Sequence, residues 1–143
     1  MRARTVLITL ISVIAAVILF VALTVLPQRL LFKDFDYYCF YTGNTSKDCK
    51  EVRTTSSTAA LTRITLKNVC GESATYSSLN LDEFLASVNG EIVFTETLSD
   101  SVNYYCTASL PYSVELYGHE INLHICVKDG SVTVGSPIIF GGY

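Results

Sequence analysis

The fold of this chain is decided by the stretch LHICVKDGSVTV, which runs from Leu123 to Val134. Apolar and polar residues alternate on both sides of Asp129-Gly130, a dipeptide that favours a two-residue hairpin turn. The turn sets three cross-strand pairs: Val127 with Val132, Ile125 with Val134, and Cys126 with Thr133. Because the two apolar pairs share one face, the stretch predicts an antiparallel hairpin with a single buried face.

A second hairpin is expected directly before the first one. A loop at Gly118-His119 pairs apolar with apolar and polar with polar residues: Leu116 with Ile121, Val114 with Leu123, Tyr112 with Ile125, Glu115 with Asn122, and Ser113 with His124. The two hairpins would then share a polar, uncovered sheet face. We predict that this face is the binding surface, with five residues on it: Ser113, Glu115, Asn122, His124 and Thr133. Pro137 ends regular pairing, and residues 138–140 can still cover an edge.

The rest of the domain mixes strands and helices. Strands are expected over 36–42, 72–77, 92–97 and 102–109, and residues 43–48 form a polar turn. Residues 57–69 favour a helix capped by Ser56 or Ser57, with Gly71 as its stop. Asn80 opens a second helix that ends at Asn89-Gly90. The pattern predicts an α+β fold, with about two helices on one face of an antiparallel sheet.

The amino end predicts a membrane anchor. Residues 5–26 carry no charge, and as a helix they would be about 33 Å long, enough to cross a hydrocarbon core of about 30 Å. Arg2 and Arg4 favour a cytoplasmic location for residues 1–4. We therefore predict a single-pass signal anchor over 5–26, a juxtamembrane linker over 27–35 and an extracytoplasmic domain over 36–143. The alternatives are a cleaved signal peptide, although no Ala-x-Ala site is present, and a buried soluble helix.

Composition excludes several function classes. The net charge is −3 and the sequence pI is about 5.3, so no polybasic surface for nucleic acid is expected. The sequence lacks a Gly-rich phosphate loop, a CxxC motif and a complete G-x-S-x-G elbow. We therefore expect no enzymatic activity and no cofactor.

All five cysteines follow the predicted anchor, as an oxidising exterior would permit. Cys39 and Cys49 bracket a polar turn, and we predict a disulfide between them; two reduced thiols are the alternative. Cys106 and Cys126 are expected to lie too far apart for a bridge. Cys70 is expected to be a buried thiol, and an odd count leaves at least one thiol free or paired between chains.

One alternative site involves metal chemistry. His124 and Cys126 share a strand face by parity, which permits a weak zinc or copper ligand pair. An ordinary solvated polar face explains the same pattern, and the aromatic residues of 36–42 are expected to fill the core or an interface.

The C-terminal part of the chain resembles a known family. Residues 121–125, residues 132–139 and the closing Tyr143 resemble the carboxy-terminal signature of YwmB-like proteins, which are secreted or membrane-anchored proteins of Firmicutes and related bacteria. Residues 93–96 and 103–106 fit small clostridial relatives. The resemblance implies an extracytoplasmic α+β domain in a Gram-positive-type cell, and it carries over no catalytic residue.

These observations together predict a non-enzymatic envelope protein, in which an anchor displays a domain that binds an envelope protein or wall component. The alternatives are a small metal-binding or enzymatic domain centred on His124 and Cys126, and an accessory subunit of a membrane complex. Small residues on the anchor, Ala15, Ala16 and Ala22, would permit close helix packing in such a complex.

Overall fold

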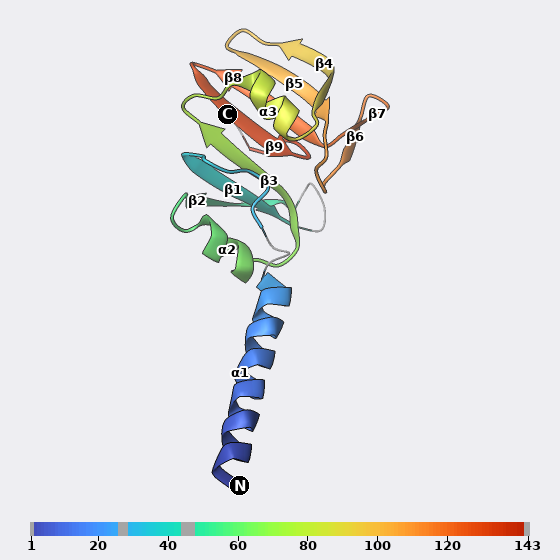
Figure 1. The fold of residues 1–143 in the computed structure, drawn as a ribbon. Helices are drawn as coiled ribbons and strands as arrows, with labels where there is room; N and C mark the ends of the chain where they lie inside the picture. The colour runs from blue at the N-terminus through green and yellow to red at the C-terminus, as the bar shows by residue number, and fades with distance from the viewer. Residues whose placement is uncertain (1, 26–28, 44–47, 142–143) are drawn as a thin grey trace.

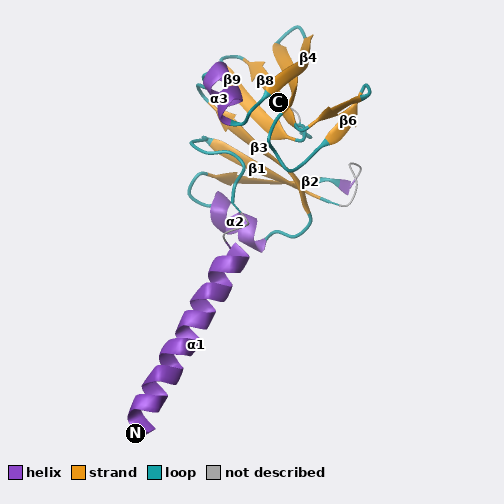
Figure 2. Cartoon of the chain, turned by 45° about the vertical axis from the view of Figure 1, so that its right-hand side comes forward, coloured by secondary structure: helices purple, strands orange, loops and turns teal. Residues whose placement is uncertain are grey.

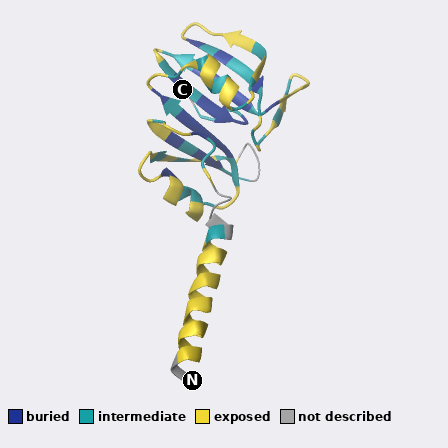
Figure 3. Cartoon of the chain, viewed as in Figure 1, coloured by how far each residue is buried: buried dark blue, intermediate teal, exposed yellow. Residues whose placement is uncertain are grey.

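The computed structural model describes residues 2–25, 29–43 and 48–141. Helix α1 (Arg2–Val25) stands apart from a domain of strands and two short helices (Figure 1). Residues Arg4–Ala22 of α1 are long and apolar enough to cross a membrane. Side chains 4–21 are all exposed (Figure 3), so no part of the domain solvates this helix. The predicted apolar helix is confirmed; the expected last anchor residue, Leu26, lies outside the described residues.

Seven strands form one antiparallel sheet in the order β2-β1-β3-β9-β8-β5-β4. Their bounds are β1 (Tyr37–Thr42), β2 (Lys50–Thr55), β3 (Val69–Tyr76), β4 (Glu91–Thr97), β5 (Ser101–Thr107), β8 (Leu123–Lys128) and β9 (Ser131–Ser136). The β8–β9 hairpin has the predicted register, including the pair Ile125–Val134. Its turn works because Asp129 and Gly130 both adopt the positive φ that a type I′ turn requires.

The second hairpin differs from its prediction. Its strands β6 (Val114–Leu116) and β7 (His119–Ile121) form a separate two-stranded sheet, visible beside the large one in Figure 2. The turn is Tyr117-Gly118, both with positive φ, so Val114 pairs with Ile121 instead of Leu123. Asn122 ends the ladder because its side-chain amide bonds both the N–H and the carbonyl of Ala108, at 2.5 and 2.7 Å. Strand β8 consequently pairs with β5.

Both predicted helices are present and pack on the same sheet face, which confirms the α+β layer. Helix α3 (Leu81–Ser87) begins where expected, with the Asn80 side chain accepting from the Glu83 N–H at 3.3 Å. Helix α2 (Ala59–Thr65) is capped by Thr58 and not by a serine, and no side-chain hydrogen bond closes the cap.

The predicted stop of α2 at Gly71 was wrong. Gly71 lies inside β3, where a Cβ would meet the Ser136 carbonyl oxygen at 2.8 Å. This glycine therefore serves the close approach of two strands, and the helix ends earlier because Leu66 is already extended.

The core lies between the sheet and the two helices. Tyr38, Phe40, Ile125 and Val134 are fully buried on this face, and partly buried residues of α3 pack against them. Phe32 from the segment after α1 joins the same cluster at 2 % exposure. The predicted linker is thus partly built into the domain.

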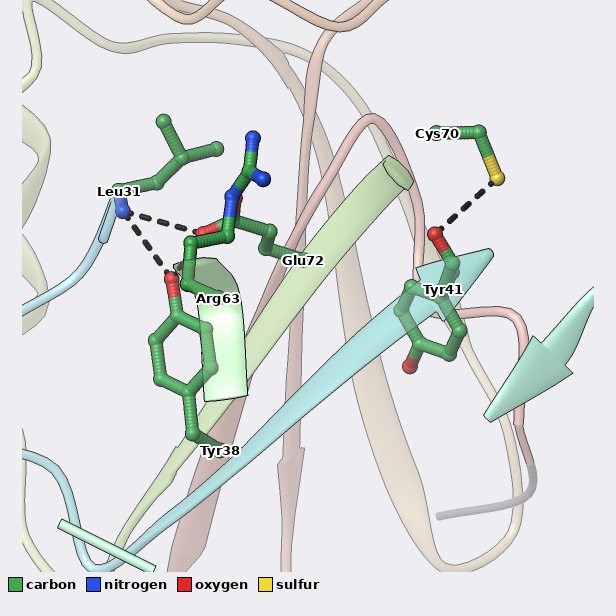
Figure 4. A network of polar contacts seen from close by, with 6 residues as sticks. All are labelled: Leu31, Tyr38, Tyr41, Arg63, Cys70 and Glu72. Atoms are coloured by element: carbon green, nitrogen blue, oxygen red, sulfur yellow. Dashed lines mark hydrogen bonds and ion pairs between the residues drawn. The ribbon is translucent and has the colours of Figure 1, made fainter. Parts of the chain in front are cut away.

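A buried polar network ties that segment to three other elements (Figure 4). The Glu72 carboxylate of β3 accepts hydrogen bonds from Tyr38 Oη, from the Leu31 N–H at 3.2 Å and from Arg63 Nε at 3.1 Å. The Leu31 N–H also lies 3.0 Å from Tyr38 Oη. Because the carboxylate is paired and hydrogen-bonded from all these elements, its charge is tolerated inside the core.

Candidate functional site

The sheet face opposite the helices is polar in its centre. Strand alternation directs Tyr37, Cys39 and Tyr41 of β1 away from the core, and the paired positions on β3 are Thr75, Ser73 and Gly71. On β8 and β9 the same parity gives His124, Cys126 and Thr133. Of the predicted face, only the residues of β8 and β9 lie here, beside the outward-facing residues of β1 and β3.

This face is hollowed by a cavity of about 650 Å³. Its walls come from β1, β2, β3, β8 and β9, with the segment after β9 at one side, and they include Tyr37, Cys39, Tyr41, Glu51, Arg53, Thr55, Ser73, Thr75, Cys126, Lys128, Ser131, Thr133 and Ile139. The volume lies in the range of sites that hold small molecules or short polymer segments. We call this cavity the sheet-face hollow.

Hydroxyl groups lie on the floor of the sheet-face hollow, although more of its exposed lining is apolar than polar. Thr75 Oγ1 and Thr133 Oγ1 lie 3.2 Å apart across β3 and β9, and both residues are half-buried. Tyr41 Oη bonds Ser73 Oγ at 2.9 Å, and burial raises the pKa of this phenol to about 12, so it stays protonated. The floor can therefore donate and accept hydrogen bonds without carrying a charge.

The charges at the rim are compensated. Arg53 pairs with Glu51 at 3.1 Å, and hydrogen bonding to this carboxylate raises the arginine pKa. Lys128 pairs with Asp100 at 2.9 Å, and the hydrogen bond from Lys128 lowers the Asp100 pKa. The two pairs place planar and ionic hydrogen-bonding groups at the rim of the hollow. Because each charge faces an opposite charge, the electrostatic potential at the rim is not dominated by one sign.

Tyr37 supplies an aromatic surface at the same rim. Its side chain is 65 % exposed, although it belongs to a regular central strand of the domain. The aromatic residues of this strand were expected to fill the core or an interface, and Tyr38, Phe40 and Tyr41 are indeed buried, whereas Tyr37 is not. Strict alternation along β1 was the signal that could have separated Tyr37 from its neighbours.

The segment after β9 lies across the face and does not cover an edge, contrary to expectation. The Ile139 N–H donates to His124 Nδ1 at 3.3 Å, and the Phe140 ring meets the edge of Tyr41 at 5.0 Å. A Cβ on Gly135 would lie 2.8 Å from Ile139 Cγ1, so this glycine allows the segment to approach.

The His124 side chain is buried, and both of its ring nitrogens are hydrogen-bonded. It is 2 % exposed, its ring stacks on Tyr105 at 4.5 Å, and burial lowers its pKa to about 4. Because Nδ1 accepts from Ile139, the ring proton sits on Nε2, which donates to Asn103 Oδ1 at 3.0 Å. Both nitrogens that could bind a metal are occupied. Across the described ranges, no group of three or more potential metal-binding side chains occurs.

The structure does not bring the five predicted site residues together. Thr133 lines the sheet-face hollow, while His124 lies beneath the segment after β9. The Asn122 side chain is hydrogen-bonded to the Ala108 backbone. Glu115 pairs with Glu120 in the separate hairpin, and the exposed Ser113 precedes that hairpin. The shifted turn at Tyr117-Gly118 removed the last three from the large sheet.

The cysteines are distributed over both faces. Cys39 and Cys126 line the hollow, and the fully buried Cys106 points into the core, so Cys106 and Cys126 are separated by the sheet. Burial, and after it the neighbouring thiols of Cys70 and Cys39, raise the pKa of the Cys49 thiol to about 11. The thiol of Cys39 itself approaches the Phe40 carbonyl at 3.8 Å. The predicted bridge partner Cys39 therefore makes no side-chain bond to Cys49 in this structure, and residues 44–47 of the predicted turn lie outside the described ranges.

Comparisons with known protein families, with curated proteins and with solved structures found no match to this chain.

Proposed function

We propose that this protein is a membrane-anchored binding protein of a bacterial cell envelope, and that the sheet-face hollow holds a hydroxyl-rich ligand such as a segment of wall glycan. The observation that carries the proposal is a hollow with both hydroxyl and aromatic groups in its lining, on the sheet face that neither α2 nor α3 covers. Polar side chains on a regular sheet are not needed for the core, so a recognition role explains them well.

The lining supports a neutral polyol better than a charged ligand. The hydroxyls of Thr55, Thr75 and Thr133 can each donate and accept, whereas Ser131 Oγ donates to the Lys128 carbonyl and is left as an acceptor. The Glu51–Arg53 pair adds planar groups, and Tyr37 offers a ring face against which the C–H side of a sugar can pack. A strongly anionic or cationic ligand would have to compete with the existing ion pairs.

The anchor supports the proposed location. A helix that can span the bilayer, preceded by Arg2 and Arg4, favours display of the domain outside the cytoplasm. The resemblance to YwmB-like proteins points to the same compartment and stays a prediction, as does the absence of enzymatic activity. The metal-binding alternative loses support because both ring nitrogens of His124 are already bonded.

The test is cosedimentation of the full-length protein, in detergent micelles, with purified insoluble cell walls. We expect saturable binding that soluble N-acetylglucosamine oligomers compete away. Tyr37→Ala should weaken binding tenfold or more, because an exposed tyrosine is a typical binding anchor. Thr133→Val, which removes one hydroxyl with little change of shape, should weaken it by a smaller factor.

Tyr117→Ala is the matched control, because Tyr117 is 89 % exposed and does not line the hollow. It should bind as the parent does. The proposal fails if the parent does not bind, or if Tyr37→Ala and Tyr117→Ala bind equally well.

A further inference from the structure

We propose that Cys49 and Cys70 form a disulfide that closes β2 and α2 into a covalent loop. The bridge replaces the Cys39–Cys49 pairing expected from spacing alone. It rests on the proposed function in one respect, since an extracytoplasmic location is what exposes these thiols to oxidants in the cell.

The register brings the two cysteines to the same end of β1. Thr42, the last residue of β1, pairs with Lys50 on one side and with Val69 on the other. Cys49 directly precedes Lys50, and Cys70 directly follows Val69. The two cysteines therefore flank the end of one strand, although they are far apart in sequence.

Local irregularities bring the thiols closer. The β1–β3 register shifts between Tyr41 and Thr42, and Cys70 Sγ lies 3.4 Å from the Tyr41 carbonyl oxygen at this shift (Figure 4). Gly43 follows β1, and a Cβ there would lie 3.2 Å from the Cys49 Cα. Because Gly43 has no side chain, the Cys49 backbone can approach the end of β1 this closely.

The thiols of Cys49 and Cys70 lie within interaction range of each other. The pKa of the Cys49 thiol is raised to about 11, mainly by burial and next by the neighbouring Cys70. A thiol with so high a pKa reacts slowly near neutral pH, because only the thiolate attacks a disulfide. This chemistry suits a bridge that forms once and persists, and it does not suit a rapid redox switch.

The reaction is thiol–disulfide exchange with a disulfide donor. The Cys49 thiolate attacks one sulfur of the donor, and a mixed disulfide forms as one donor thiolate leaves. The Cys70 thiolate then attacks the Cys49 sulfur, and the second donor thiolate leaves. Two cysteine thiols and one donor disulfide become one protein disulfide and two donor thiols, so two electrons pass to the donor.

The test uses the full-length protein in detergent, incubated with oxidised glutathione and then alkylated. Mass mapping of a non-reduced digest should find one peptide pair joining Cys49 to Cys70, with Cys39, Cys106 and Cys126 alkylated. Cys49→Ser and Cys70→Ser should each abolish the bridge, and Cys39→Ser should keep it. The oxidation rate should rise about tenfold per pH unit between pH 7 and 9.

Oxidation should also raise the thermal midpoint by about 10 °C, because the closed loop restricts the unfolded chain. A Cys39–Cys49 peptide, loss of the bridge in Cys39→Ser, or five free thiols after the incubation would overturn the pairing. Alkylation in intact cells separates the two proposals. A bridge that forms in vitro while the cellular thiols stay reduced would support the pairing and contradict the extracytoplasmic location.

Discussion

At the scale of single residues, His124 is held neutral by its surroundings. The ring is stacked on Tyr105, bonded through both nitrogens and removed from water. Protonating the His124 ring would place a positive charge away from water, which is unfavourable. It would also break the hydrogen bond from the Ile139 N–H, because a protonated Nδ1 can no longer accept. Protonation of this ring would therefore remove one of the contacts that hold the segment after β9 on the face.

This arrangement predicts a pH-dependent stability. An unfolded histidine binds a proton near pH 6.5, whereas His124 in the folded state does so only near 4. The unfolded state therefore binds more protons between these values, and the contribution of His124 is complete above pH 6.5 and falls as the pH falls towards 4. The loss is about 3 kcal/mol of unfolding free energy. Urea unfolding of the full-length protein from pH 7 to 4 measures it.

The variants His124→Gln and His119→Gln isolate this effect from the carboxylates that titrate in the same range. His119 is exposed in β7 and should leave the pH dependence of stability unchanged. His124→Gln should lower stability at pH 7 but flatten its pH dependence by about 3 kcal/mol. An unchanged slope in His124→Gln would show that the ring is already charged or exposed.

At the scale of elements, Glu72 connects β3 to α2, β1 and the segment after α1. Its side chain is 1 % exposed and that of Arg63 is 17 % exposed, so both charges are largely removed from water. The Glu51–Arg53 pair has the same chemistry and a similar distance, but the Arg53 side chain is 76 % exposed. The two pairs form a natural comparison, because burial is the main difference between them.

We expect Glu72→Gln to lower the unfolding free energy by about 3 kcal/mol, since it leaves the buried Arg63 charge without its partner. Glu51→Gln should leave stability nearly unchanged, because water solvates the exposed pair. The double variant with Glu72→Gln and Arg63→Met should lose less than the sum of the two single changes. Additive losses in chemical denaturation would contradict an energetic coupling between these side chains.

At the scale of the whole molecule, the chain divides into a helix exposed along its length and a domain with its own core. The side chains of residues 4–21 of this helix are all exposed, and none of them is buried against the domain. Apolar surface of this extent is stable only in a hydrocarbon environment or in contact with another apolar partner. The domain needs no such environment, because its core is closed by α2, α3 and Phe32.

Charges in the middle of α1 should release the protein from the membrane. Val13→Arg combined with Val17→Arg is expected to cost about 5 kcal/mol or more of insertion free energy. The parent should sediment with membranes and resist extraction by high salt, and its domain should be cut by a protease added outside the cells. Val13→Leu with Val17→Leu is the control and should behave as the parent does. Recovery of the parent in the soluble fraction would refute the anchor.

Features that depend on local pattern could be predicted from the sequence alone. The apolar helix, the Asn80 cap and the Asp129-Gly130 hairpin follow from periodicity and turn chemistry, which act over a few residues. The strand order, the turn of the second hairpin, the exposure of Tyr37 and the proximity of Cys49 to Cys70 depend on long-range packing and could not be read from local pattern. The physical reason is that β-pairing joins residues distant in the chain, and a side chain such as Asn122 can redirect a strand through one non-local hydrogen bond.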